Sequence, residues 1–354
     1  MSTAIDCIRA LCHHDTGTSI PMSISAADRS EVRAESVARA TLHVAAVLRV
    51  TLLDLLRRPI VPTLMYSVAV LIAVMPFIPF LTLGQENRLV RDANLSLILM
   101  FGIALSVYAA GTGLYREIHR GGGELLLSKP ISPLAFLAAK YAGVIVLLAL
   151  FMLAATPAFI VSSRASRGLA QVDWRLEGPL LAGLVAAPLL AALIALCRRR
   201  NVSQYAALLL PAVTMAVLAV TTPYGHAHPP SGEFRSGYLL AAAAGVGLVL
   251  VNIAAIAMTL STRLSIPVSA SLTVLALVAG LSAGGIEIGG LSFLLNALVP
   301  DWMNFWILSS VPPASPHLAS LFLWNLIQSF LFSSALFILG CLLFWNAEIS
   351  KKST

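Results

Sequence analysis

The sequence predicts an all-α integral membrane protein, a polytopic bundle of about eight transmembrane helices. Hydrophobic residues make up 58% of the 354 residues and charged residues only 11%, whereas an ordinary soluble domain is about 25% charged. The mean hydropathy is +0.88, and the apolar residues form long continuous runs, unlike the alternating pattern of a membrane β-barrel. A chain with so few charges could not cover a soluble surface.

Eight apolar runs approach the roughly 20 residues that a helix needs to cross a bilayer. Alanine and glycine are frequent in the fourth, fifth and sixth runs, which lets helix backbones approach closely in lipid. The predicted spans cover residues 60–82, 93–115, 134–160, 179–197, 203–222, 238–260, 266–285 and 318–345.

The spans belong to one membrane domain, predicted over residues 36–346. Residues 1–35 are polar and irregular, and we expect a disordered tail with Met22 as an alternative start. This tail has no apolar stretch long enough for a signal peptide. Residues 347–354 are expected to form a short cytoplasmic tail.

An amphipathic interface helix is predicted over residues 36–58, where apolar residues recur at helical spacing before Pro59 ends the helix. Such a helix lies in the headgroup layer, where its cations contact anionic lipid of the bilayer. Those cations are Arg49, Arg57 and Arg58. The alternative is a cytosolic extension of the first span.

The Lys and Arg residues predict how the chain is oriented. With a cytoplasmic N-terminus and eight spans, 17 of the 23 Lys and Arg residues lie on the cytoplasmic side. This distribution follows the positive-inside rule. We therefore expect a multi-pass protein of the cell (inner, cytoplasmic) membrane with both termini in the cytoplasm. The outer segment 286–317 is rich in aromatic residues and predicts a short interfacial or re-entrant helix.

Several function classes are disfavoured by what the sequence lacks. Lys140 is the only charged side chain inside the predicted spans, near an end where it can snorkel. Ion-coupled transporters usually place acidic or histidine residues in mid-membrane, so a secondary transporter is disfavoured. None of the four lysines follows a glycine, so the phosphate-binding loop G-x-x-x-x-G-K-[ST] is absent.

No catalytic residue, cofactor or metal site is predicted. The four cysteines form no C-x-x-C pair, and His226 and His228 fit a plain loop better than a metal site. A formal charge of +7 is not taken as a sign of nucleic-acid binding, because the charges follow the membrane topology.

The loop between the second and third predicted spans has an unusual composition. It begins with charged residues, continues through three glycines and a leucine-rich turn, and stops at prolines. This order predicts a helix end, a flexible corner and a helix of about six residues across the cytoplasmic face. Exposed leucines there indicate a protein partner, the alternative being a solvated loop. The candidate contact residues are Arg116, Glu117, Gly121, Glu124, Leu126, Leu127, Ser128 and Pro130.

This loop resembles the type-2 family of ABC transporter permeases. Weaker resemblances lie in the interface helix from Leu48 to Arg58, in Ser261–Leu264 and in the outer segment from Pro300 to Trp306. Together they extend over roughly residues 36–346. The loop departs from the family pattern at Gly122, Pro133 and Ala139, in place of Thr, Arg and Gly. The matching loop residues are Arg116, Glu117, Gly121, Leu126, Leu127, Ser128, Pro130, Ser132, Phe136, Leu137 and Lys140.

The resemblance implies a non-catalytic, membrane-spanning subunit of an ABC exporter. In that family two permeases, identical or homologous, assemble with two ATPase subunits, and the short cytoplasmic helix fits a groove on the ATPase. A second hypothesis is a polytopic scaffold or assembly factor that transports nothing. A lipid-modifying enzyme is disfavoured, since no acid–base pair or nucleophile is placed at membrane depth. The transported substrate is not indicated by the sequence.

Overall fold

A computed structural model of the chain describes residues 44–78, 86–115, 133–166, 171–199, 201–227, 236–282, 302–306 and 317–352. The chain divides into two compact units, Met1–Leu42 and His43–Thr354. All the described residues belong to the second unit, and the account below concerns that unit alone.

The described residues are helical apart from short turns and one isolated bridge between Ser166 and Val172. This confirms the predicted all-α class. A helix over residues 44–57 comes first and ends, as predicted, at a turn around Pro59. The elements that follow are α3 (Ile60–Val74), η1 (Met75–Phe77), α4 (Glu86–Ala110), the π-helix η2 (Gly111–Tyr115), α7 (Pro133–Ala165), α8 (Trp174–Arg198), α9 (Val202–Ala227), α10 (Ser236–Ser261), α11 (Ile266–Ser282), η5 (Trp302–Phe305) and α14 (Leu318–Lys352).

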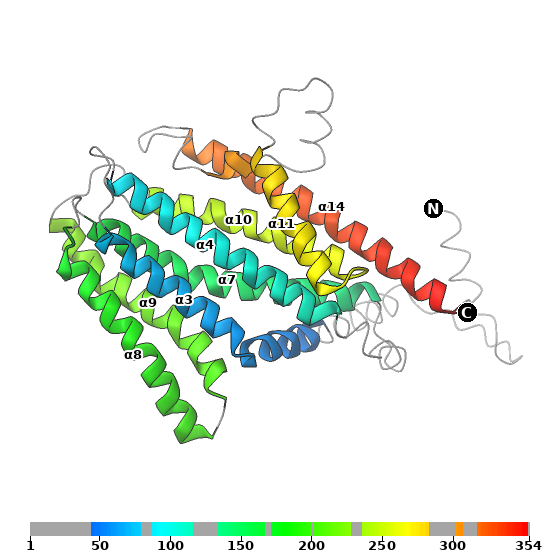
Figure 1. The fold of residues 1–354 in the computed structure, drawn as a ribbon, viewed down its shortest axis with the longest axis horizontal. Coiled ribbons are helices and arrows are strands. Elements are labelled where there is room, and N and C mark those ends of the chain that lie inside the picture. Colours follow the sequence, from blue (N-terminus) through cyan, green and yellow to red (C-terminus); the bar gives the residue numbers. More distant parts are fainter. Residues whose placement is uncertain are drawn as a thin grey trace, which may run out of the picture. The chain divides into compact units, whose positions relative to one another are not determined.

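The long helices lie side by side as a bundle and alternate in direction along the chain (Figure 1). We call the end that holds the helix of residues 44–57 the proximal end. There Ser203 at the start of α9 donates to the carbonyl of Leu56 at 2.9 Å. Arg263, between α10 and α11, donates to the carbonyl of Leu343 in α14 at 2.8 Å.

The opposite end, which we call the distal end, is joined by a separate set of polar contacts. Ser166 after α7 donates to Asn87 in α4 at 3.1 Å. Arg164 donates to Ser236 at the start of α10 at 2.6 Å. Successive long helices thus end alternately at the two ends of the bundle.

Seven of the described helices are long and apolar enough to cross a membrane, namely α3 with η1, α4, α7, α8, α9, α10 and α14. The predicted eighth span corresponds to α11, a shorter apolar helix of 17 residues, which is about 25 Å long at 1.5 Å per residue. Ile266 at its start lies against Gly111 near the proximal end, and α11 also contacts η5 at the distal end. This helix therefore runs between the two ends of the bundle.

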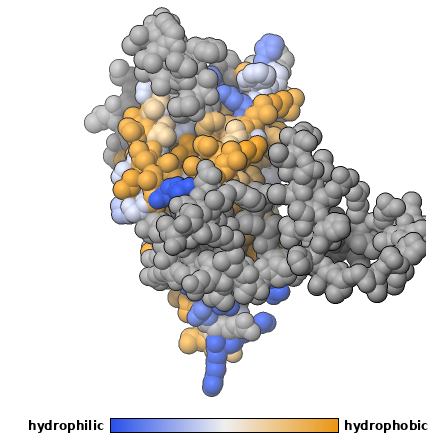
Figure 2. All heavy atoms as spheres, turned by 90° about the vertical axis from the view of Figure 1, so that its right-hand side faces the viewer, coloured by the Kyte–Doolittle hydropathy of each residue, from blue (hydrophilic) through white to orange (hydrophobic). Residues whose placement is uncertain are grey.

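The two helices α7 and α10 form the centre of the bundle, with 67% of the most apolar stretch of each buried, against 17% for α14. Small residues permit this packing, as predicted for the alanine-rich spans. The side chain of Leu250 in α10 occupies the space beside Gly102 in α4, and Val213 in α9 lies against Gly183 in α8. On the face shown in Figure 2, the exposed surface of the described residues carries broad hydrophobic areas, and hydrophilic residues gather in separate patches.

Two predicted helix starts differ from the structure. The helix α4 begins at Glu86 and α8 at Trp174, earlier than the predicted residues 93 and 179. Both helices continue past their apolar runs because Arg91 and Glu177 are buried inside the bundle. Of the predicted outer segment 286–317, only residues 302–306 and 317 are described. There η5 is short and its Trp302 and Phe305 are buried against the bundle, so the interfacial or re-entrant position of this segment stays a prediction.

Candidate functional site

The predicted interface helix and the end of α4 meet at the proximal end, in a set of four residues that we call the junction: Asp54, Arg58, Tyr108 and Thr112. Arg58 donates to Asp54 Oδ2 from Nη2 at 2.7 Å and from Nε at 3.3 Å. The four-residue spacing places the carboxylate before the cation on one helix face, the favourable order for such a pair.

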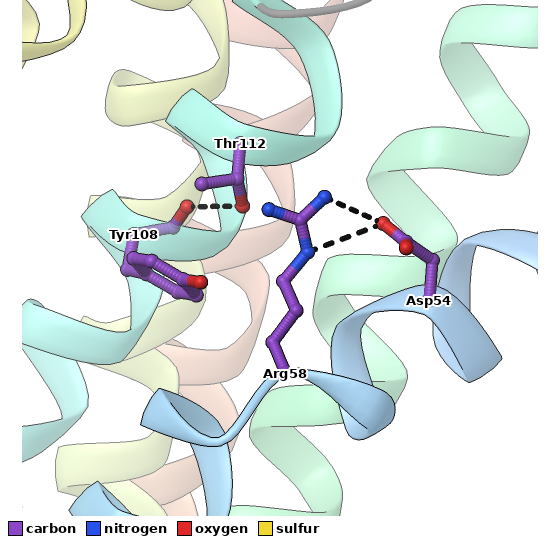
Figure 3. Close-up of polar contacts among 4 residues, drawn as sticks. All are labelled: Asp54, Arg58, Tyr108 and Thr112. Carbon is purple, nitrogen blue, oxygen red and sulfur yellow. Dashed lines mark hydrogen bonds and ion pairs between the residues drawn. The ribbon is translucent and has the colours of Figure 1, made fainter.

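Arg58 extends from the end of the first helix toward Tyr108 in the last turn of α4 and Thr112 in η2 (Figure 3). Thr112 bonds back to its own helix, donating to the carbonyl of Tyr108 at 2.7 Å. Burial by itself lowers the pKa of the Arg58 guanidinium, but interactions with Asp54 and Tyr108 outweigh it and raise that pKa overall. The cation is therefore retained at a half-buried position where two elements meet.

Apolar contacts fix the same helix to the rest of the bundle. Leu55 and Leu56 are buried, and Ser203 from α9 bonds to the carbonyl of Leu56 at 2.9 Å. Thr51 lies against α7, where a methyl group on Gly143 would be 3.0 Å from its Cγ2. The first helix is thus attached to α4, α7 and α9.

The structure describes residues 44–57 of the helix predicted over 36–58, and that part is helical. Arg49 and Arg57 are exposed, whereas the guanidinium of Arg58 pairs with Asp54. The contact of these three cations with lipid stays a prediction.

The predicted ATPase-contact residues lie outside the described part of the chain. These are Arg116, Glu117, Gly121, Glu124, Leu126, Leu127, Ser128 and Pro130. Their loop leaves from Tyr115, at the end of η2, and returns at Pro133, at the start of α7. Both of these helix ends lie at the proximal end of the bundle with the junction (Figure 1).

The prediction of a single charged residue in the spans was wrong. Arg91 in α4 and Glu177 in α8 are buried within helices that qualify as membrane spans, with exposed fractions of 3% and 0%. Lys140 is also buried, at 5% exposed, and its Nζ lies 5.5 Å from the centre of the Phe136 ring. Lys140 therefore points into the bundle and does not snorkel to a membrane surface.

A polar cluster links α10 to α14. Asn252 is fully buried, and its Oδ1 accepts hydrogen bonds from Ser329 at 2.9 Å and from Ser333 at 2.8 Å. Asn325 donates to the carbonyl of Asn304 at 2.9 Å. Asn252 thus joins α10 to α14, and Asn325 joins α14 to η5, as polar groups between helices in lipid do.

Open grooves border the bundle. A groove of about 800 Å³ lies between α7, α10 and α14 beside Ser329 and Ser333, and another of about 840 Å³ lies between α3, α8 and α9 beside Tyr66 and Pro188. The described residues that line these two grooves include no charged side chain and no histidine, so both suit an apolar molecule better than an ionic one. Within the described residues, no three His, Cys, Asp or Glu side chains come together as metal ligands do.

The chain matches no protein-family model, no curated protein and no solved structure.

Proposed function

We propose that this chain is the membrane-spanning permease subunit of an ABC exporter, driven by ATP hydrolysis on a separate subunit. The observation that supports this most is the junction. The helix of residues 44–57 is attached to the end of α4 through Arg58 and Tyr108, and the loop that resembles a coupling element leaves from the same end. A partner that binds this loop would act on both α4 and the first helix.

In this proposal the loop over residues 116–133 fits a groove on the ATPase. Closure of two ATPase subunits would then bias the bundle between two conformations, because ATP-bound partners bind one of them better. Displacement of the loop reaches α4 through η2 and α7 through Pro133. A second permease copy or homologue completes the complex.

The proximal end is cytoplasmic in this proposal. The Lys- and Arg-rich stretches of the sequence adjoin the start of α3, the end of α4, the turn between α8 and α9 and the end of α14. These helix ends lie at the proximal end, as the positive-inside rule requires of a cytoplasmic side. With α11 as an eighth crossing, both termini lie in the cytoplasm of a cell whose inner membrane holds the protein.

The first experiment tests the ATPase partner. Purified alone, the chain should show no ATP hydrolysis above background, and it should co-purify with its ATPase when the two are expressed together. Stoichiometric ATP binding by the isolated chain would contradict the proposal. A well-folded chain that captures no ATPase would favour the scaffold hypothesis instead.

The second experiment tests the loop itself. Leu126→Asp places a charge where an apolar groove is expected, and an unpaired desolvated charge costs several kcal/mol, enough to dissociate the ATPase. Pro130→Ala only relaxes the end of a short helix and should be milder. The measurements are ATPase association and thermal aggregation in detergent, which reports folding. Unchanged association in folded Leu126→Asp protein would remove the loop from the interface.

A further inference from the structure

Glu177 is directed into the bundle from the first turns of α8. Its side chain is 0% exposed, whereas Arg175 and Arg198, the other charged residues of this helix, are exposed. Glu177 shares the buried face of α8 with residues that pack against the bundle. These are Leu180, Leu184, Ala187, Ala191 and Ala195.

Among the residues that the structure describes, the carboxyl group of Glu177 has no hydrogen-bond partner on either oxygen. It does not cap its own helix, because Asp173 performs that role. Asp173 Oδ1 accepts from the backbone N–H of Arg175 at 3.1 Å, and its backbone carbonyl accepts from the N–H of Glu177 at 3.0 Å. The carboxyl group is therefore buried without the donors that normally stabilise a carboxylate.

The helices packed against α8 supply no described cation to this carboxyl group. The helix α3 contains Tyr66 but no charged residue or histidine, and the titratable residues of α7 are Lys140, Tyr141 and Arg164. Lys140 lies toward the proximal end, and Arg164 donates to Ser236 of α10. The helix α9 carries Tyr205 near its proximal start and Tyr224 and His226 in its last turn, where the side chains lie outside the described residues.

We propose that Glu177 is a proton-binding site, occupied by a proton while α8 is packed as in this structure. An isolated carboxyl group in apolar surroundings is far easier to bury as the neutral acid than as the anion. The proton is the ligand, since a metal cation needs several ligands and no three His, Cys, Asp or Glu side chains come together around it in the described part of the chain. Release of the proton requires water to reach the carboxyl group.

Because Glu177 is 0% exposed, water is expected to reach it when the first turns of α8 separate from α3, α7 and α9, the helices packed against α8. The contacts of that part of the helix include the rings of Trp174 and Phe77, whose centres are 5.4 Å apart. Pro179 has no N–H to return to the carbonyl of Arg175, which weakens the same turn. Opening at the distal end and loss of the Glu177 proton are therefore linked. This inference does not depend on an ATPase partner.

The proton can be observed by infrared spectroscopy of the full chain in detergent at about pH 7. The difference spectrum between wild type and Glu177→Gln should contain the C=O band of a protonated carboxylic acid, shifted in heavy water. Asp54→Asn is the matched control, because Asp54 is exposed and paired with Arg58, and it should remove only carboxylate bands. A Glu177→Gln spectrum that also loses only carboxylate bands would overturn the proposal.

Thermal unfolding between about pH 6 and about pH 9 gives an independent readout. If the folded chain holds a proton that the unfolded chain releases, the wild type loses stability as the pH rises. Glu177→Gln and Glu177→Met cannot release a proton, so their melting temperatures should fall less over this range. Glu177→Met replaces the amide variant if the latter fails to fold. Equal pH dependence in wild type and the folded variant would refute the proton site.

Discussion

Asn252 connects α10 to α14 through two hydrogen bonds whose removal has a calculable effect. Its Oδ1 accepts from Ser329 at 2.9 Å and from Ser333 at 2.8 Å. Hydrogen bonds between membrane helices average about 0.6 kcal/mol and reach about 1.7 kcal/mol. We therefore expect Ser329→Ala and Ser333→Ala each to lower the free energy of unfolding by about 0.6 kcal/mol.

The double variant should cost more than the sum of the two single variants. Asn252 Nδ2 already lacks a hydrogen-bond partner within the described helices, and loss of both serines would leave Oδ1 without one as well. A buried polar atom without a partner costs about 1–3 kcal/mol. In an Asn252→Leu background the acceptor is gone, so Ser333→Ala should become neutral or stabilising there.

Thermal or denaturant unfolding in one detergent measures these differences. Ser334→Ala is the matched control, because Ser334 follows Ser333 on α14 but donates to the carbonyl of Leu331 in its own helix. It should leave stability nearly unchanged. An equal loss from Ser333→Ala in the wild-type and Asn252→Leu backgrounds would show that the hydrogen bond contributes nothing to stability.

Three further outcomes are expected. Gly183→Ala should destabilise the folded protein by about 1–3 kcal/mol in thermal unfolding, because a Cβ there would be 2.9 Å from Val213 Cγ1. Gly237→Ala is the control and should leave stability unchanged, because a Cβ there would meet none of the described atoms within 4 Å. Equal effects of the two variants would contradict the close α8–α9 contact. A double-mutant cycle of Asp54→Asn and Arg58→Ala should give a coupling energy of only about 0.3–0.5 kcal/mol. Arg58→Ala should lower the free energy of unfolding more than Asp54→Asn does, because it also removes the interaction with Tyr108. The reverse order would count against the junction. Tags at both termini should be digested by protease in inside-out vesicles, and a tag between residues 223 and 235 should be protected; a protected C-terminal tag would rule out eight crossings.

Hydrophobic runs were sufficient to predict which segments form the long helices, because an apolar stretch in lipid must satisfy its backbone internally. The break at Pro59 followed from proline chemistry in the same way. Helix ends were harder to predict. The sequence around Arg91 and Glu177 is polar enough to suggest a loop, yet both side chains turn into the bundle and the helix continues past them.

The direction in which a side chain points was also beyond the sequence. The helix α7 is apolar on nearly every face, so no pattern identifies the side on which Lys140 lies, and its burial depends on how neighbouring helices pack. Within the junction, the Asp54–Arg58 pair could be expected from four-residue spacing. The contact of Tyr108 with Arg58 could not be expected from the sequence, because the two residues come close only when α4 packs against the first helix.

The π-helix at Gly111–Tyr115 gives α4 a means of rotating its last residues. A π-turn contains about one residue more than an α-turn, and one residue of an α-helix corresponds to about 100° of rotation and 1.5 Å of rise. If η2 tightened to α-helical geometry, Tyr115 would turn by roughly that angle relative to Tyr108, while the helix before Gly111 kept its register. A change confined to one turn could thus alter the direction in which the chain continues after Tyr115, without any shift of the long helices.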